Sequence, residues 1–185
     1  MKYLLLIFSL LLTSVSWSKD VDSGDLVKRG GLYYEKFTDE PFTGKSTGRK
    51  QGRLKYGKKE GLWLVYWSNG QLQEKGKWKE GKKEGEWFLY FEGGQLSYKG
   101  NWKNGKRDGE YKSFYKNGNL FFSYYYKDGK KEGEQLNYSE NGQLVKKRYF
   151  KNDKIHGEYL QYDKNGQLTS TSIFKDGEFI EKIEH

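Results

Sequence analysis

The chain has 185 residues, of which 34% are hydrophobic, 18% aromatic and 32% charged, and its formal net charge is +9. The low hydrophobic content excludes a large core of branched aliphatic residues. The many rings argue against disorder, because disordered chains are poor in aromatics. The absence of cysteine excludes disulfides and cysteine-based catalysis. The length fits one domain or one array of repeats.

The first residues predict an export signal. Lys2 precedes an apolar run over residues 3–12, and Ser16 and Ser18 are small residues placed for cleavage after Ser18. The run is shorter than the roughly 20 apolar residues that a membrane-spanning helix needs. We therefore expect residues 1–18 to be a signal peptide and the mature chain to be secreted or to stay in the periplasm or cell envelope. An uncleaved anchor is the alternative.

Residues 19–51 do not follow the pattern of the rest of the chain. The stretch KRGGLYYEKF (28–37) imitates a strand, and EPFTGKSTG (40–48) indicates a turn and a short strand. We predict that this segment caps the open edge of a sheet, as terminal units of repeat proteins do.

From residue 52 to residue 178 the sequence repeats every 24 residues. Each unit holds two runs of about six residues with rings at alternate positions, separated by turn signals such as Asn-Gly; this is typical of β-hairpins. We predict an all-β fold, an elongated single antiparallel sheet of tandem 24-residue β-hairpins, followed by a charged tail over residues 179–185. The recurring positions are Gly61, Gly85, Gly109, Gly133 and Gly157; Gly70, Gly94, Gly118, Gly142 and Gly166; and Leu72, Leu96, Leu120, Leu144 and Leu168.

The ring and leucine columns predict where the core lies. Tyr66 and Leu64 head two columns on one face of the first strand of each unit, and Leu72 and Trp78 head columns on the second strand. Rings stacked between neighbouring hairpins can bury area in a sheet without a second layer. We therefore predict that these four columns form the core.

The units resemble the MORN repeat (membrane occupation and recognition nexus) in its bacterial variant form. The residues that carry the likeness are GKKEGEW at 81–87, Tyr90-Phe91, Gly94-Gln95-Leu96 and Gly100-Asn101-Trp102, and it extends over residues 52–178. The resemblance implies stacked hairpins without catalytic residues that act as a scaffold or binding surface. Some relatives are linked to membranes, and some bacterial members are labelled antitoxins.

Groups for catalysis are scarce. The histidines are His156 and His185, so a two-histidine metal site or a histidine-based triad lacks its residues. Carboxylates recur in the column headed by Glu60, but they stand beside lysines, which favours solvated ion pairs over an acid–base pair. No phosphate-binding glycine loop precedes a helix. We expect no enzyme activity, no cofactor and no metal.

The second face of the predicted strands is apolar in the first three units and polar in the last two. If it is exposed, it marks a partner; the rings of residues 32–42 folding over it are the alternative. We predict a partner-binding site made of Trp63, Val65, Trp67, Trp87, Leu89, Phe91, Tyr111 and Tyr115.

Several partners fit such a face. A protein of the cell envelope would make the chain an exported, non-enzymatic scaffold for protein–protein interaction. Cell-wall glycan is an alternative, because rings stack on sugars and lysines attract anions. An antitoxin-like inhibitor of a partner protein fits the signal peptide poorly, and weak attachment to an anionic membrane surface would be screened by salt. Nucleic acid is not expected.

Overall fold

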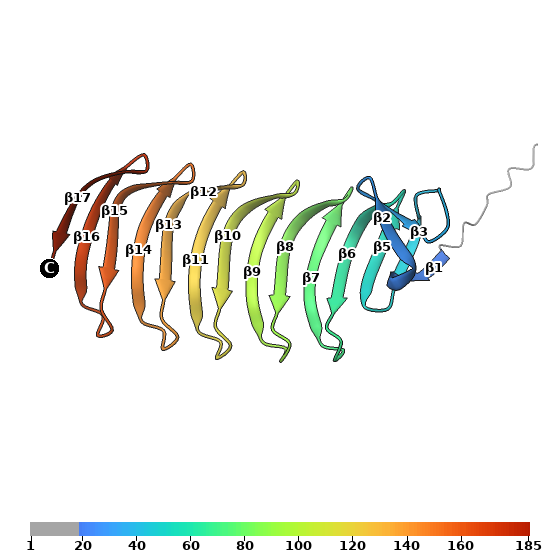
Figure 1. The fold of residues 1–185 in the computed structure, drawn as a ribbon, viewed down its shortest axis with the longest axis horizontal. Helices are drawn as coiled ribbons and strands as arrows, with labels where there is room; N and C mark the ends of the chain where they lie inside the picture. Colours follow the sequence, from blue (N-terminus) through green and yellow to red (C-terminus); the bar gives the residue numbers. More distant parts are fainter. Residues whose placement is uncertain (1–18) are drawn as a thin grey trace, which may run out of the picture.

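The computed structural model describes residues 19–185, so the predicted signal peptide lies outside the described residues. These residues form one long sheet of fifteen strands with a separate two-stranded sheet at its N-terminal end (Figure 1). The strands are β1 (Lys19–Asp22), β2 (Leu26–Arg29), β3 (Leu32–Glu35), β4 (Gly44–Thr47), β5 (Lys50–Lys55), β6 (Lys58–Tyr66), β7 (Leu72–Lys79), β8 (Lys82–Tyr90), β9 (Leu96–Lys103), β10 (Lys106–Phe114), β11 (Leu120–Lys127), β12 (Lys130–Lys131), β13 (Gly133–Tyr138), β14 (Leu144–Lys151), β15 (Lys154–Tyr162), β16 (Leu168–Lys175) and β17 (Glu178–Glu184).

The predicted fold class is confirmed, because neighbouring strands from β4 to β17 pair in an antiparallel meander. Two features of the N-terminal end differ from the prediction. β1 pairs with β4 in parallel, and β2 and β3 form a sheet of their own. One short 3-10 helix covers Ser23–Asp25. Within residues 19–185 no helix has the length and apolar character needed to cross a membrane.

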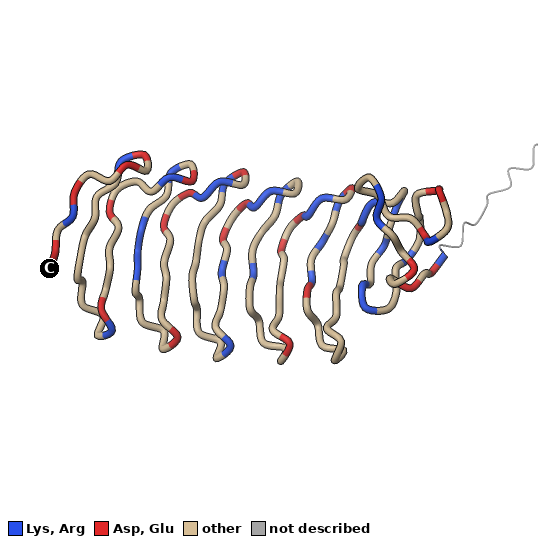
Figure 2. Tube along the Cα trace, viewed as in Figure 1, with Lys and Arg blue, Asp and Glu red and all other residues tan. Residues whose placement is uncertain are grey.

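The two rows of turns differ in geometry. At one edge the turns are two residues long, as at Asn104-Gly105, where φ is 51° and 81°. Two successive positive φ values define the type I′ turn, which matches the twist of a hairpin. At the other edge five-residue loops such as 67–71 contain the Asn-Gly pairs, and there only the glycine, as Gly70 at φ 85°, is left-handed. Lysine, arginine and carboxylate residues crowd the edge with the tight turns (Figure 2).

A column of carboxylates ties the first strand of each repeat to the tight turn at the end of that repeat. Glu84 accepts a hydrogen bond of 2.8 Å from the backbone N–H of Asn104, which would otherwise lack a partner in the tight turn. In the last repeat His156 replaces the carboxylate, and its Nδ1 lies 3.4 Å from the N–H of Asp176. The same contact is made by Glu60 with Glu80, Asp108 with Asp128 and Glu132 with Asn152.

Glycines opposite rings let a one-layer sheet bury its largest side chains. Trp87 on β8 pairs with Gly76 on β7, and a Cβ at Gly76 would stand only 2.1 Å from Cε3 of Trp87. The indole therefore lies over the backbone of the neighbouring strand, and only 1% of the residue is exposed. Trp63 lies over Gly52 and Tyr111 over Gly100 in the same way.

The exposure predicted for the largest rings is wrong. Trp63, Trp87 and Tyr111 are buried, at 3%, 1% and 7% exposure. They share one face of the sheet, which we call the ring face, with the column headed by Trp78, since Trp78 pairs with Gly61. The predicted core columns headed by Leu64, Tyr66 and Leu72 lie on the opposite face, which we call the leucine face, and are half-buried.

Residues 19–51 cover the ring face only at its N-terminal end. The N–H of Tyr33 donates to the carbonyl of Gly57 (2.9 Å), which holds the β2–β3 hairpin beside the turn between β5 and β6. Val21, Phe42, Leu54 and Trp63 form one buried cluster, against which Leu26, Tyr33 and Trp78 pack.

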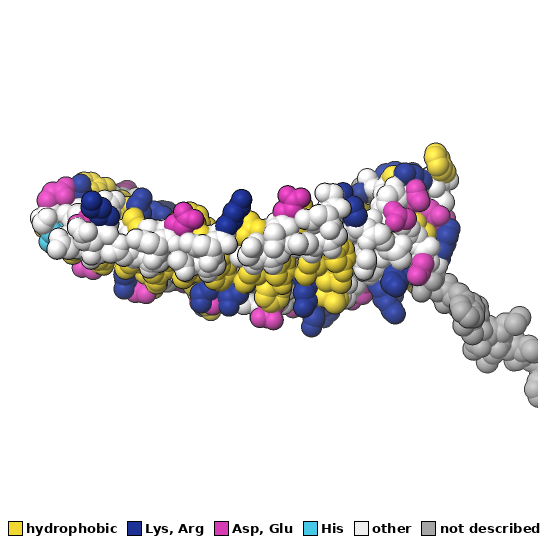
Figure 3. Space-filling model, turned by 90° about the horizontal axis from the view of Figure 1, so that it is seen from below, with side chains coloured by type: hydrophobic (Ala, Val, Ile, Leu, Met, Phe, Trp, Pro, Cys, Tyr) yellow, Lys and Arg dark blue, Asp and Glu magenta, His cyan; other side chains and the backbone are white. Residues whose placement is uncertain are grey.

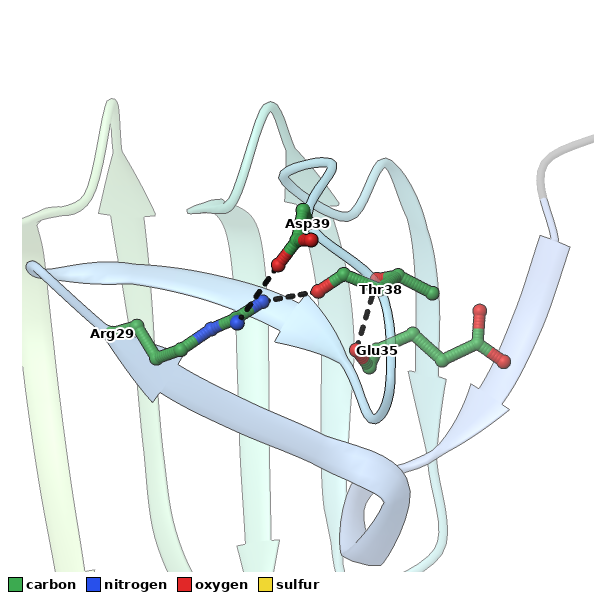
Figure 4. Close-up of polar contacts among 4 residues, drawn as sticks. All are labelled: Arg29, Glu35, Thr38 and Asp39. Carbon is green, nitrogen blue, oxygen red and sulfur yellow. Dashed lines mark hydrogen bonds and ion pairs between the residues drawn. The ribbon is translucent and has the colours of Figure 1, made fainter.

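The loop after β3 is held by Arg29. Its guanidinium donates to Asp39 (3.2 Å) and to the carbonyl of Thr38, whose hydroxyl donates to the carbonyl of Glu35 (Figure 4). The same guanidinium stacks on the ring of Tyr34, with 4.2 Å to its centroid. Phe37 at the loop tip is fully exposed and left-handed at φ 62°, so it does not cover the ring face.

The charged tail predicted over residues 179–185 is instead mostly strand. β17 pairs with β16, and all of its residues are exposed, including Phe179, Ile180 and Ile183. Glu178, Glu181, Lys182 and Glu184 are interspersed with these apolar residues along the last strand. Charges on an edge strand discourage pairing with other chains.

Candidate binding surface

A groove of about 710 Å³ lies on the ring face at the edge with the five-residue loops. We call it the turn-edge groove. Trp67 and Phe91 each directly follow the first strand of their repeat, and Leu89 lies two residues before Phe91. Trp67 is held in place because its Nε1 donates to the carbonyl of Tyr90 in the next repeat (3.3 Å). The lining includes Trp67, Glu74, Leu89, Phe91, Glu92 and Lys116.

The predicted site residues thus fall into two groups. Trp67, Leu89 and Phe91 line the groove, whereas Val65 and Tyr115 are half-buried elsewhere on the first three repeats. Trp63, Trp87 and Tyr111 are buried beside the backbone and offer no free ring to a partner. In a view from below, hydrophobic side chains form a band along the flank of the repeats, interrupted by charged ones (Figure 3).

Cations from successive repeats lie on the buried rings. Nζ of Lys83 stands 4.0 Å from the ring centroid of Trp87 and 4.7 Å from that of Trp102. The guanidinium of Arg107 stands 4.5 Å from the Tyr111 centroid. These distances are those of cation–π contacts. We call the column of Lys59, Lys83, Arg107 and Lys131 the cation row.

Burial lowers the pKa of Lys59 to about 8. Desolvation is the largest cause, because it disfavours the charged ammonium. Glu74 opposes the shift, and the nearby Lys50, Lys28 and Lys83 reinforce it. The pKa of Lys83 is lowered as well, again mainly by desolvation, with Glu74 opposing and Arg107 adding to the shift.

Five segments of the chain match the family described as MORN repeat variant, at residues 59–80, 83–104, 107–128, 131–152 and 155–176. Together they cover more than half of the chain. The chain belongs to the MORN repeat variant family. This confirms the resemblance that the sequence carries.

Other comparisons add little to the family match. No curated protein matches the sequence. Among solved structures, a mutant of S. aureus TarM in complex with Fondaparinux, alpha-GlcNAc-glycerol and UDP is similar over 52% of this chain and 19% of that one, with 12% identity and a TM-score of 0.35. This chain thus spans about a fifth of that protein, and so slight a likeness says nothing about function.

The fourth MORN repeat replaces the buried ring with a polar network on the ring face, whereas the fifth has a ring again, Tyr159. Gln135, at the position of Trp87 two repeats earlier, is fully buried. Its Oε1 accepts from Nε of Arg148 (2.6 Å), and its Nε2 donates to Asn137 (2.6 Å). Every polar end of this glutamine is engaged, as burial requires.

Two features of the ring face were missed by sequence reasoning. The glycine column of Gly52, Gly76 and Gly100 marks where a ring will lie, but the ring that fills it comes from the next strand. The cation row is visible as a 24-residue period of Lys59, Lys83, Arg107 and Lys131, yet the sequence places it in a turn. In the structure these residues belong to strands, because the tight turns are only two residues long.

No cluster of three or more histidine or carboxylate residues is placed to hold a metal ion within residues 19–185. The carboxylates of the column headed by Glu60 accept hydrogen bonds from turn N–H groups instead. Their task in these repeats is therefore structural.

Proposed function

We propose that this MORN-repeat chain is an exported, non-enzymatic scaffold that binds a protein partner in the cell envelope through the turn-edge groove. The observation that carries the proposal is the groove itself, which joins half-buried rings from two repeats. Its volume of about 710 Å³ admits several side chains of a partner. Aromatic residues at the centre of a concave patch with charged residues around them are typical of protein-binding sites.

The charges of the groove indicate what the partner presents. Glu74 and Glu92 contribute two carboxylates to the lining, and Lys116 contributes one ammonium. A segment with apolar residues and at least one lysine or arginine complements this arrangement. The rings of Trp67 and Phe91 would receive the apolar side chains, and the carboxylates would receive the basic one.

Stacking of sugars on the large rings has less support. That reading needs open ring faces, whereas Trp87 is 1% exposed and has Lys83 above it. Export rests on the sequence of residues 1–18, and the lack of catalysis rests on the family and on the structural use of the recurring carboxylates.

The groove can be tested with substitutions that the chain already tolerates elsewhere. Two repeats after Leu89 and Phe91, the equivalent positions hold Asn137 and Ser139. The variant Leu89→Asn/Phe91→Ser should therefore fold and lose the partner. The control is Phe88→Lys on the leucine face. It introduces the residue that the next repeat has at the equivalent position, Lys112.

The readout is capture from envelope extract of the source organism, followed by calorimetry with the purified captured protein. We expect the parent and the control to retain the protein and the groove variant to release it. Equal recovery by all three would show that the groove is not the contact. Export is checked separately by sequencing the N-terminus of the mature protein, which should begin at Lys19.

A further inference from the structure

The ring face carries an excess of positive charge that no ion pair among residues 19–185 neutralises. On strands β5 to β16, Lys50, Lys146 and Arg148 lie on the same face as the cation row, and Glu74 is the one carboxylate of these strands that shares it. The ion pairs of the repeats, Lys112 with Glu110 and Lys147 with Glu134, lie on the leucine face. The cation row is therefore available to an anion from outside.

The rings hold the cations in place. Lys83 and Arg107 each contact rings on three strands and Lys131 contacts rings on two. Arg107 also donates to the hydroxyl of Tyr126 (3.2 Å). Their long chains have already lost much of the freedom that binding would otherwise remove, so a ligand meets a preorganised array. The β2–β3 hairpin lies over the first member, Lys59, as the packing of Tyr33 shows. The open part of the row is thus Lys83 to Lys131.

Donors outnumber acceptors on this part of the face. The indole N–H groups of Trp78, Trp87 and Trp102 are buried and have no hydrogen-bond acceptor among the described residues. Lys83 lies over all three of these rings, so a ligand that draws its ammonium outward would also bring acceptor oxygens near the indoles. A ligand rich in oxygen acceptors and negative charge complements this surface.

The spacing of the row indicates the form of the ligand. Successive members are two strands apart, which is about 9.4–9.8 Å along the sheet. That distance is close to the rise of one disaccharide in an extended pyranose chain. An extended peptide would have to place acidic side chains at every third residue, and these would alternate in direction.

We propose that Lys83, Arg107 and Lys131 bind a linear anionic polysaccharide with one carboxylate or sulfate per disaccharide, laid across the strands along the sheet. Each repeat then contributes one charge contact, and the contacts act together along one polymer. This site is separate from the turn-edge groove and does not depend on the proposed protein partner.

Hyaluronan is a suitable probe, because it carries one carboxylate per disaccharide. Binding to the chain from Lys19 to His185 is measured by calorimetry with oligosaccharides that grow by one disaccharide at a time. We expect affinity to rise with each disaccharide until the row is spanned, and to fall with salt. Affinity that does not depend on length would overturn the proposal.

Variants drawn from the chain itself isolate the row. The fifth repeat has Ile155 at this position, so the variant Lys83→Ile/Arg107→Ile/Lys131→Ile should fold. It should bind hyaluronan at least about tenfold more weakly than the parent. The variant Lys83→Arg/Lys131→Arg places at both positions the arginine that the chain already has at Arg107. It should keep the affinity for hyaluronan. Lys82→Gln/Lys106→Gln/Lys130→Gln removes the same charge from the adjacent positions and should lose far less.

Two further outcomes count against the proposal. If the variant at Lys82, Lys106 and Lys130 loses as much as the isoleucine variant, net charge rather than the row drives binding. If poly-L-glutamate of matched charge binds as tightly as hyaluronan, the row takes an acidic peptide instead. The groove variant Leu89→Asn/Phe91→Ser must keep hyaluronan binding, so failure of the groove and failure of the row can be told apart.

Discussion

The first three repeats and the last two use the same backbone but differ in the side chains that fill the ring face. In β6 to β11 the ring face is filled by Trp63, Trp87 and Tyr111 over glycines or beside other rings. In the fourth repeat Gln135, bonded to Arg148, takes the place of the buried first-strand ring, while Phe150 on the second strand stays buried, and in the fifth repeat the buried Ser170 lies on the same face. The tight turns and their carboxylate or histidine acceptors continue unchanged through both halves. The turns and the strand pairing are therefore the constant part of this fold, whereas the ring-face residue of the first strand changes from Trp87 to Gln135.

The largest expected effect separates the two core chemistries. Trp87→Ala should lower the free energy of unfolding by about 3–5 kcal/mol, because it leaves a cavity over Gly76. Gln135→Ala should cost about 1–3 kcal/mol, because Arg148 and Asn137 lose a partner while little apolar area is lost. Urea denaturation of both variants measures the difference. Equal costs would mean that the two halves rely on the same kind of core.

A double-mutant cycle tests the fit of ring to glycine. Gly76→Ala should destabilise the parent by about 1–3 kcal/mol, because the new Cβ collides with the indole. In the Trp87→Ala background the same change should cost nothing, since alanine suits a strand better than glycine. Denaturant midpoints of the four proteins give the coupling. An equal cost in both backgrounds would place the constraint in the backbone instead.

The pH dependence sharpens the contrast at the N-terminal end. The pKa of Lys59 is about 8 in the folded chain and higher when unfolded, so the unfolded state binds more protons between these values. Stability should therefore rise as the pH goes from about 8 toward 10.5, the ordinary lysine value. The control Lys59→Ile introduces the residue found at the equivalent position of the fifth repeat, Ile155. Its free energy of unfolding should not rise over this pH range. The charged or titratable groups that surround Lys59 are Lys28, Tyr33, Lys50, Glu74 and Lys83.

Titration of the Lys59 ammonium by NMR provides a direct check. A pKa at the ordinary lysine value in the folded protein would contradict the burial of this side chain under Tyr33.

The smallest effect is expected outside both halves, at the exposed loop tip. Phe37→Asn should change the free energy of unfolding by less than about 0.5 kcal/mol, because Phe37 contacts nothing and asparagine tolerates a positive φ. Thermal denaturation measures it against Phe42→Ala in the buried cluster, which should cost about 3–5 kcal/mol. A large loss for Phe37→Asn would show that the loop packs against the sheet in solution.

Sequence reasoning succeeded where the signal is local and failed where it is not. The strands and the hairpin order follow from alternation and turn residues within one unit. The buried face does not, because a strand such as β8 carries rings on both faces, Trp87 on one and Phe88 on the other. What decides between them is the contact of Trp87 with Gly76, eleven positions away on the neighbouring strand, and that contact exists only once the register is set. The same holds for the groove, which needs Trp67 and Phe91 from two repeats at once.

The sequence by itself determined the all-β class, the period of 24 and the membership in the MORN repeat variant family, because each depends on residues close together in the chain. Only the tertiary structure decided that Trp63 and Trp87 are core, that Trp67 and Phe91 line a groove, and that the cation row stands in line on one face. The physical reason is that burial and charge alignment in a one-layer sheet arise between strands, through a register that no single repeat contains.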